Sequence, residues 1–185
     1  MLKSKPESVA NPQTIGQISQ RNRFTLMVLI YRTLAGLIAI GFASRAIAKS
    51  AYNAFMSSNT VPATSVDGSG NASLVYANLS ISKGTIGQQP ITNSDETAGQ
   101  TTAGIEWDAQ TVPVGSNSQD VAFGAVYNQT QDAWFTGSGS VRDNESLAIT
   151  CDSLVSGDVL HYYLFFKAFD GSETSDSAYF TTIVA

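Results

Sequence analysis

The sequence predicts a mostly β protein, namely an immunoglobulin-like antiparallel β-sandwich preceded by an extended arm and a long apolar helix. Three observations predict this. Residues 1–23 are polar, residues 24–56 hold the single long apolar helix pattern, and short apolar runs alternate with turn residues from about residue 74 onward. Regularly spaced short strands are typical of an antiparallel sandwich. We therefore expect a polar basic arm (1–23), an apolar helical region (24–56), a linker (57–73) and the β-sandwich (74–185).

The first 23 residues are expected to form an arm with no core of its own. They contain Pro6, Pro12 and Gly16, and they are rich in Asn and Gln between residues 11 and 20. Such a segment buries too little apolar surface to offset the entropy of ordering. We expect it to become ordered only against something else.

The helical region is apolar around most of its circumference from Phe24 to Phe55, with only a narrow polar stripe. A helix of this kind must be buried on nearly all sides. Three surroundings stay open, namely a bilayer, a cleaved signal peptide, and other protein. Arg32 would lie near the middle of a membrane span, at a cost of about 2.5 to 3.5 kcal/mol, and Met1 at the start argues against cleavage. We favour burial against the β body and neighbouring subunits, which Gly36 and Gly41 assist by allowing close contact.

Seven apolar runs separated by Gly, Asn, Asp and Pro predict the strands of the body. The strongest run, from Val159 to Phe169, is apolar on both faces, so a sandwich that buries only one face does not satisfy it. The apolar helix is the natural cover, from the same chain or from a neighbour. The strand candidates are residues 74–82, 102–109, 120–128, 133–136, 147–151, 159–169 and 178–184.

Charge divides the chain into two parts. Residues 1–50 hold seven of the ten basic side chains and one acid, a net charge of +6, whereas the rest of the chain carries −11. Opposite potentials steer and orient association, so the sequence favours a subunit that docks on copies of itself or on a partner. The acidic body argues against nucleic-acid binding, which needs clustered Lys and Arg.

Residues that carry enzymatic chemistry are scarce. Cys151 is the single cysteine and His161 the single histidine, and both lie in apolar runs where a packing role is expected. The Gly-rich stretches at 68–70 and 137–140 lack the Lys and the strand-to-helix context of a phosphate-binding loop. We therefore expect no catalytic, cofactor or metal site, and the carboxylates Asp170, Glu173 and Asp176 are interpreted as solvated turn residues.

The two tryptophans receive different interpretations. Trp107 lies between Glu106 and Asp108, so strand alternation points the tryptophan inward and the two acids outward. Trp134 lies on a short run between polar loops. Core packing is the favoured role for Trp134, and ligand stacking is the alternative.

Short motifs spread over most of the chain resemble, in their order, an uncharacterised family of Bacteroidota and their phages that is known as a domain of unknown function. The resemblance implies no activity and no site residues. It supports burial of the helix in protein, because the helix of the family is more polar. The motifs are Asn11-Pro12-Gln13-Thr14, Gln17, Gln20, Arg21, Phe24, Ile40-Gly41-Phe42, Ser50-Ala51-Tyr52-Asn53-Ala54, Ser82-Lys83-Gly84, Trp107-Asp108, Tyr127-Asn128, Gly157-Asp158 and His161-Tyr162-Tyr163.

Two partial resemblances compete for the ends of the chain. Arg23-Phe24-Thr25-Leu26 followed by an apolar helix is similar to a type IV pilin, although Arg23 replaces the glycine and Val28 the glutamate of that pattern. The body resembles fibronectin type III and immunoglobulin-like sandwiches through Trp107-Asp108 and its tyrosine-rich penultimate strand. This second likeness supports the fold and says nothing of function.

These observations favour a non-enzymatic structural subunit of a homo-oligomeric assembly, in a phage virion or an extracellular filament. The alternatives are a surface-binding sandwich, whose loop 129–145 recognises a glycan or a host surface, and a pilin-like subunit. Other partners are virion or cell-surface proteins, and contact with a membrane is disfavoured but stays open. The expected setting is the virion or the cell surface. The expected assembly interface consists of Arg21, Arg23, Phe24, Leu29, Arg32, Leu37, Tyr163 and Phe165.

Overall fold

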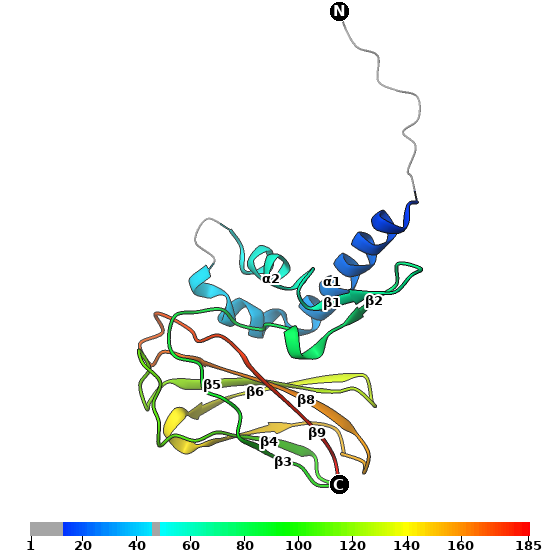
Figure 1. Cartoon of the computed structure of the whole chain (residues 1–185). Helices are drawn as coiled ribbons and strands as arrows, with labels where there is room; N and C mark the ends of the chain where they lie inside the picture. The colour runs from blue at the N-terminus through cyan, green and yellow to red at the C-terminus, as the bar shows by residue number, and fades with distance from the viewer. Residues whose placement is uncertain (1–12, 46–48) are drawn as a thin grey trace, which may run out of the picture.

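The computed structural model describes residues 13–45 and 49–185. It confirms a mostly β protein in which one long and one short helix precede three antiparallel sheets (Figure 1). The elements are α1 (Ile15–Gly41), η1 (Ala43–Arg45), α2 (Ala51–Asn59), β1 (Thr64–Val66), β2 (Ala72–Leu74), η2 (Tyr76–Asn78), β3 (Asn93–Asp95), β4 (Thr102–Glu106), β5 (Val121–Asn128), β6 (Ala133–Val141), η3 (Arg142–Asn144), β7 (Ser146–Thr150), β8 (Val159–Lys167) and β9 (Ala178–Ile183).

Helix α1 begins nine residues before the expected start at Phe24. Thr14 caps it, because its side-chain oxygen accepts a hydrogen bond from the Gln17 backbone N–H at 3.4 Å. The described end of the expected arm is therefore helical from Ile15 onward, which corrects that expectation for residues 15–23. Residues 1–12 of the arm lie outside the described residues. Glutamine and arginine are good helix formers, and a cap outweighs the polar composition that suggested an arm.

The expected linker, residues 57–73, is also structured. Helix α2 runs to Asn59, and β1 pairs with β2 in an antiparallel hairpin whose turn is held by Asp67. The Asp67 carboxylate accepts hydrogen bonds from the backbone N–H groups of Ser69 at 2.9 Å and Asn71 at 2.8 Å. The Asp, Gly, Ser and Asn residues of this segment predict a loop by composition. The same residue types also build tight hairpin turns, which is their role here.

Two larger sheets form the β body. The central sheet has the strand order β6-β5-β8-β9, and the outer sheet has the order β3-β4-β7. Between them lies a core that includes Trp107, Val126, Leu147, Leu164 and Phe166. Trp107 is 2% exposed and its indole N–H donates to the Arg142 carbonyl at 2.7 Å, which confirms the inward direction predicted for it.

Some strand bounds differ from the expected ones. The run 74–82 is not one strand, because β2 ends at Leu74 and η2 follows. The run predicted for residues 133–136 continues to Val141, and β3 pairs with β4 although its residues Asn93, Ser94 and Asp95 carry no apolar pattern. Backbone pairing with a neighbouring strand overrides side-chain propensity in these edge positions.

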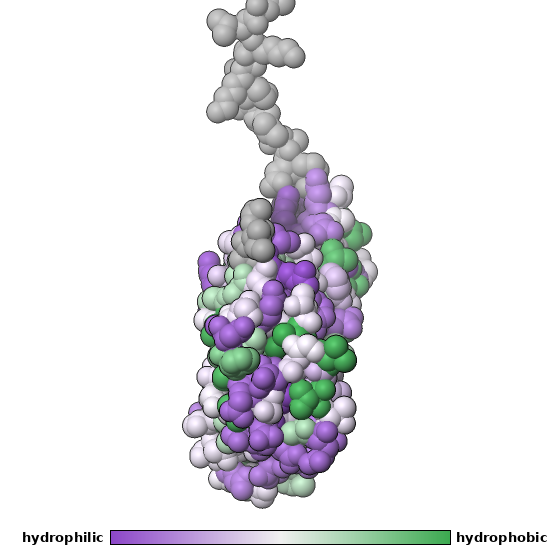
Figure 2. Space-filling model, turned by 90° about the vertical axis from the view of Figure 1, so that its left-hand side faces the viewer, coloured by the Kyte–Doolittle hydropathy of each residue, from purple (hydrophilic) through white to green (hydrophobic). Residues whose placement is uncertain are grey.

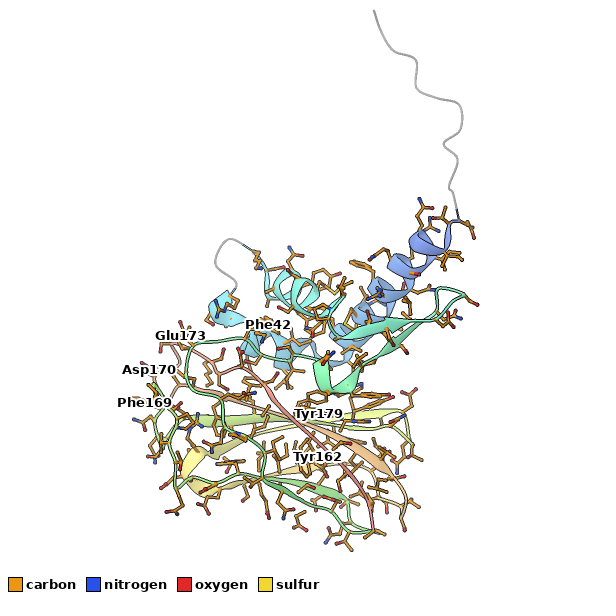
Figure 3. All side chains as sticks on the ribbon, in the orientation of Figure 1. Phe42, Tyr162, Phe169, Asp170, Glu173 and Tyr179 are labelled. Carbon is orange, nitrogen blue, oxygen red and sulfur yellow. The ribbon has the colours of Figure 1, made fainter. Side chains whose placement is uncertain are left out.

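The helical layer, made of α1, η1, α2 and the β1–β2 hairpin, covers the second face of the central sheet (Figure 1). Strand β8 consequently has two buried faces. Tyr162 lies between the two sheets, whereas Phe42 lies in the helical layer (Figure 3). Tyr163 and Phe165 point the other way from Tyr162 and pack in the same cluster as Leu34 of α1. The apolar helix of the same chain therefore covers the two-faced strand, as the sequence allowed.

Gly41 permits the close contact between the end of α1 and the β body, and Gly84 permits a close contact within the body beside it. A Cβ atom on Gly41 would lie 2.3 Å from the Ile81 carbonyl oxygen, and one on Gly84 would overlap the Thr174 carbonyl oxygen. Ser82 fills the same junction, and its hydroxyl lies 2.9 Å from the carbonyl oxygen of Gly41 and 2.6 Å from that of Ser175. The helical layer is thus fixed to the body through backbone contacts as well as apolar packing.

Candidate functional site

The outer face of α1 carries half of the expected interface. Phe24 and Leu29 are 51% and 54% exposed, and Arg21 and Arg32 are exposed beside them. The opposite face of the helix is buried on the body. A helix that shows large apolar side chains and cations to solvent is a surface suited to contact with another molecule.

The other expected interface residues contact their own chain. Leu37, Tyr163 and Phe165 are buried at the joint between α1 and the central sheet. The Arg23 guanidinium donates to the carbonyl and hydroxyl oxygens of Thr64 at 3.1 and 2.8 Å, so it fastens α1 to the hairpin. The structure therefore divides the expected set into an exposed group and a group that holds the subunit together.

Helix α1 is also long and apolar enough, by length and composition, to cross a membrane. A third of its most apolar stretch is buried inside the protein. Arg32 lies on the exposed side of the helix. On the face shown in Figure 2, hydrophobic side chains are interspersed with polar ones rather than forming one continuous apolar surface.

An aromatic pocket of about 470 Å³ lies between α1 and the central sheet. The rings of Tyr76 and Tyr127 stack with their centroids 5.6 Å apart, and the Trp134 ring lies 4.7 Å from that of Tyr127. The Tyr127 hydroxyl donates to Asp132 at 2.7 Å. Burial and the neighbouring carboxylate raise the pKa of Tyr127. The helix contributes Leu29 and neighbouring side chains, so this pocket continues the exposed face of α1.

The pocket rests on a buried histidine. The His161 ring stacks on Tyr76 with 3.8 Å between centroids, and its two nitrogens lie 2.8 Å from the Tyr179 hydroxyl and 2.9 Å from the Gln129 side-chain oxygen. Since the Gln129 oxygen can only accept, Nε2 carries the proton and Nδ1 accepts from Tyr179. Both ring nitrogens are occupied in positioning the aromatic residues, which fits the packing role expected from the sequence.

Burial lowers the pKa of His161. The unfolded chain therefore takes up a proton near pH 6.5, before the folded protein does, and stability is lost as the pH falls below that value, by at most about 1.4 kcal/mol per pH unit. We expect His161→Gln to reduce this slope between about pH 7 and about pH 5, measured by urea denaturation. Carboxylates contribute equally to both proteins, so identical slopes would contradict a neutral buried His161.

Two residues of this lining are predicted from the sequence, Trp134 for packing or ligand stacking and Leu29 for the assembly interface. The sequence assigns no role to Tyr76 or Tyr127, because the antiparallel register that places Tyr127 opposite Trp134 on one side and His161 on the other depends on tertiary pairing. Alternation along β5 places Tyr127 on the same face as Phe123 and Ala125, which pack against the helical layer. Alternation gives the face of a strand but not its neighbour.

Within residues 13–45 and 49–185, no three or more His, Cys, Asp or Glu side chains are grouped to hold a metal ion. Cys151 is buried, and burial raises the pKa of its thiol. A protonated buried thiol is a poor nucleophile.

The comparisons with known proteins concern the chain as a whole. The search of the curated proteins gives no match. The model of the Family of unknown function (DUF6266) matches residues 1–181, which confirms the expected likeness to a domain of unknown function. This chain therefore belongs to the Family of unknown function (DUF6266).

Proposed function

We propose that this protein is a non-enzymatic structural subunit that assembles with copies of itself. In this assembly the cationic outer face of α1 docks on the acidic outer sheet of the next copy. The observation that carries the proposal is the separation of charge, because α1 and the outer sheet, which bear the exposed cations and carboxylates named below, lie on opposite sides of the molecule (Figure 1).

The helical end is cationic. Arg21, Arg32, Arg45 and Lys49 are exposed there, the sequence contains no Asp or Glu from residue 8 to residue 66, and the turn of the β1–β2 hairpin adds one carboxylate, Asp67. Exposed Phe24 and Leu29 give this end apolar surface to bury on contact.

The opposite end is acidic. Asp95, Asp108 and Glu145 are exposed on or beside the outer sheet, and Glu106 is half-buried on it. Glu106 and Glu145 line a hollow of about 350 Å³ on this sheet. Tyr163 and Phe165, which the sequence predicts as interface residues, are covered by α1 of the same chain. The outer sheet offers exposed carboxylates that attract a cationic helix.

Contact between two different ends of one molecule is heterologous. It closes into a ring or continues as a filament, depending on the rotation between copies. Attraction between such ends raises the association rate and weakens as salt screens it. Self-association is therefore expected to weaken between about 0.1 M and about 1 M salt, as the Debye length falls from about 10 Å to about 3 Å.

We expect Arg32→Glu to weaken self-association at least about tenfold at low salt, because it converts an attraction into a repulsion at the docking face. Sedimentation velocity across a concentration series measures this. Lys167→Glu is the matched control, since it changes the net charge equally at the end of β8. Adding Glu106→Lys to Arg32→Glu should recover part of the association. Equal sedimentation of the wild type and both single variants would contradict the proposal.

The aromatic pocket favours one alternative function, a surface-binding module. Three aromatic rings and the Asp132 carboxylate resemble the mixed lining of small-ligand sites. The segment 129–145, expected as a loop, is largely strand β6, and it borders the pocket through Asp132 in the β5–β6 turn and Trp134 on β6. A glycan ligand would quench or shift the fluorescence of Trp134, and Trp134→Phe would remove that signal. A protein that stays monomeric and shows this response would favour the alternative.

The finer fold and the biological setting belong to the same proposal. In chain order the strands β3-β4-β7 and β6-β5-β8-β9 correspond to the A-B-E and C′-C-F-G sheets of an immunoglobulin-like sandwich. A phage virion or a bacterial cell surface is the proposed setting, which is based on the resemblance to proteins of Bacteroidota and their phages.

A further inference from the structure

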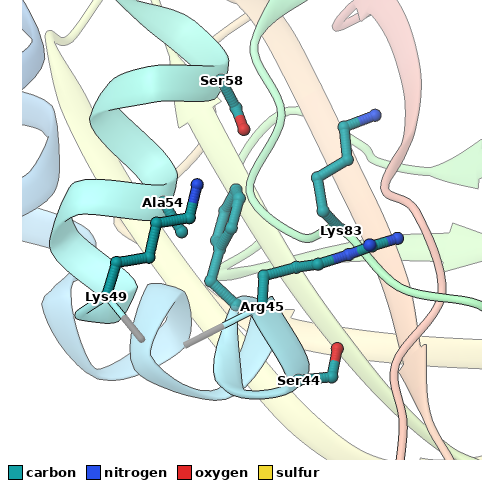
Figure 4. Close-up of a pocket in the computed structure, with 7 residues that line it drawn as sticks. Ser44, Arg45, Lys49, Ala54, Ser58 and Lys83 are labelled. Atoms are coloured by element: carbon teal, nitrogen blue, oxygen red, sulfur yellow. The ribbon is translucent and has the colours of Figure 1, made fainter. Parts of the chain in front are cut away.

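A second pocket, of about 490 Å³, opens beside the short helix on the cationic side of the molecule. Figure 4 shows its lining, in which side chains from the end of α1, η1, α2 and the segment after η2 surround one hollow, together with Lys49 just before α2. Ala54 and Ser58 lie four residues apart on α2 and so share one face of it. The lining residues are Phe42, Ser44, Arg45, Lys49, Ala54, Ser58 and Lys83.

The pocket carries an excess of positive charge. Lys83 pairs with Asp176 at 3.0 Å, and the Arg45 guanidinium donates one hydrogen bond to the Gly84 carbonyl oxygen at 3.4 Å. Within the described part of the chain, Lys49 has no ion pair or hydrogen bond. Of the three cations Arg45, Lys49 and Lys83, one is therefore paired with a carboxylate, that of Asp176. The Arg45 guanidinium has five N–H donors, and most of them are left for a ligand.

Ser44 supplies an independent observation. Its hydroxyl oxygen is buried and has no hydrogen-bond partner among the described residues. A buried polar group without a partner costs stability and calls for an explanation. A ligand can supply this hydrogen bond once the Ser44 side chain turns its hydroxyl, which has no accessible surface in the ligand-free structure, toward the pocket.

From this geometry we propose that the pocket binds a phosphomonoester that carries a small apolar or aromatic group. Guanidinium and ammonium groups recognise phosphate oxygens through charge-assisted hydrogen bonds, and the hydroxyls of Ser44 and Ser58 add uncharged donors. Phe42 and Ala54 give the pocket an apolar side that a bare ion does not use. The volume also suits a small organic molecule rather than an ion alone.

The test is calorimetric titration of the full chain with phenyl phosphate. We expect saturable binding that weakens at least about tenfold in Arg45→Gln and in Lys49→Gln, since each loses a charge-assisted hydrogen bond. Lys167→Gln is the matched control and should bind as the wild type does. Titration of Arg32→Glu, in which self-association is weakened, should give the same affinity and thereby separates this site from the assembly interface.

Three further measurements identify the ligand class. Inorganic phosphate should bind more weakly than phenyl phosphate because it leaves the apolar side empty. Phenyl phosphate should weaken from about pH 7.5 to about pH 5.5, since the second phosphate pKa is about 6, whereas phenyl sulfate should not change. Ser44→Ala should lower the affinity several-fold without lowering the melting temperature, because an unpaired buried hydroxyl does not stabilise the ligand-free fold.

Two results would overturn the proposal. One is the lack of saturable binding by phenyl phosphate in the wild type. The other is binding that Arg45→Gln and Lys49→Gln leave unchanged while their melting temperatures remain normal. If inorganic phosphate binds as tightly as phenyl phosphate, the apolar part of the proposed ligand is wrong.

Discussion

Asp120→Ala is expected to lower the free energy of unfolding by about 3 to 5 kcal/mol, because it leaves a buried guanidinium without its counter-charge. Arg142 is fully buried, and its Nη2 lies 3.4 Å from the Asp120 carboxylate. Its Cζ lies 3.8 Å over the centre of the Phe166 ring, and Nη1 donates to Gln89 at 2.9 Å. Burial lowers the pKa of Arg142 and the Asp120 charge opposes that shift.

Asp120 also orders two backbone segments. Its carboxylate accepts hydrogen bonds from the backbone N–H groups of Asn117 at 2.8 Å and Phe169 at 3.2 Å, so alanine removes these contacts together with the charge. Urea denaturation followed by circular dichroism gives the loss in free energy. The double variant Asp120→Leu with Arg142→Met should be more stable than Asp120→Ala alone, because it removes the unpaired charge.

The protein contains its own control for this prediction. Lys83 and Asp176 form a shorter ion pair, at 3.0 Å, but their side chains are 42% and 43% exposed. Lys83→Met should therefore cost less than about 1 kcal/mol, as exposed pairs usually do. A similar cost for Lys83→Met and Asp120→Ala would contradict the view that burial, rather than distance, sets the effect.

Phe165→Ala is expected to cost about 3 to 5 kcal/mol, since it opens a cavity at the joint between the helical layer and the central sheet. The Phe165 side chain is fully buried and its ring stacks on Phe123 with 5.4 Å between centroids. It belongs to the same cluster as Leu34, Ile38 and Phe55 of the helical layer. The variant should therefore loosen α1 as well as lower the melting temperature.

Phe169→Ala is the matched control, because Phe169 is the same residue type at 64% exposure and lies four residues further along the chain. Its effect should stay within about 0.5 kcal/mol. Hydrogen exchange measures the loosening of α1 separately from the loss of overall stability. Faster exchange in α1 is expected for Phe165→Ala and not for Phe169→Ala. Equal stability of the two variants would mean that α1 does not share a core with β8.

The sequence by itself determined the fold class and the faces that need burial. The turn-punctuated runs predicted a mostly β body, the alternation around Trp107 predicted its inward direction, and the apolar periodicity after Phe24 predicted the long helix. The two apolar faces of β8 predicted that something must cover the second one. These features are local, because each can be inferred from the periodicity of side chains along one element.

Only the tertiary structure decided which surface meets which. The same chain supplies α1 as the cover of β8, which turns Leu37, Tyr163 and Phe165 from expected interface residues into core. The register of β5 brings Tyr127 beside Trp134, and the turn η1 after α1 brings Arg45 into one pocket with Lys83. Periodicity shows that a face must be buried, but it carries no information on the residues far along the chain that bury it.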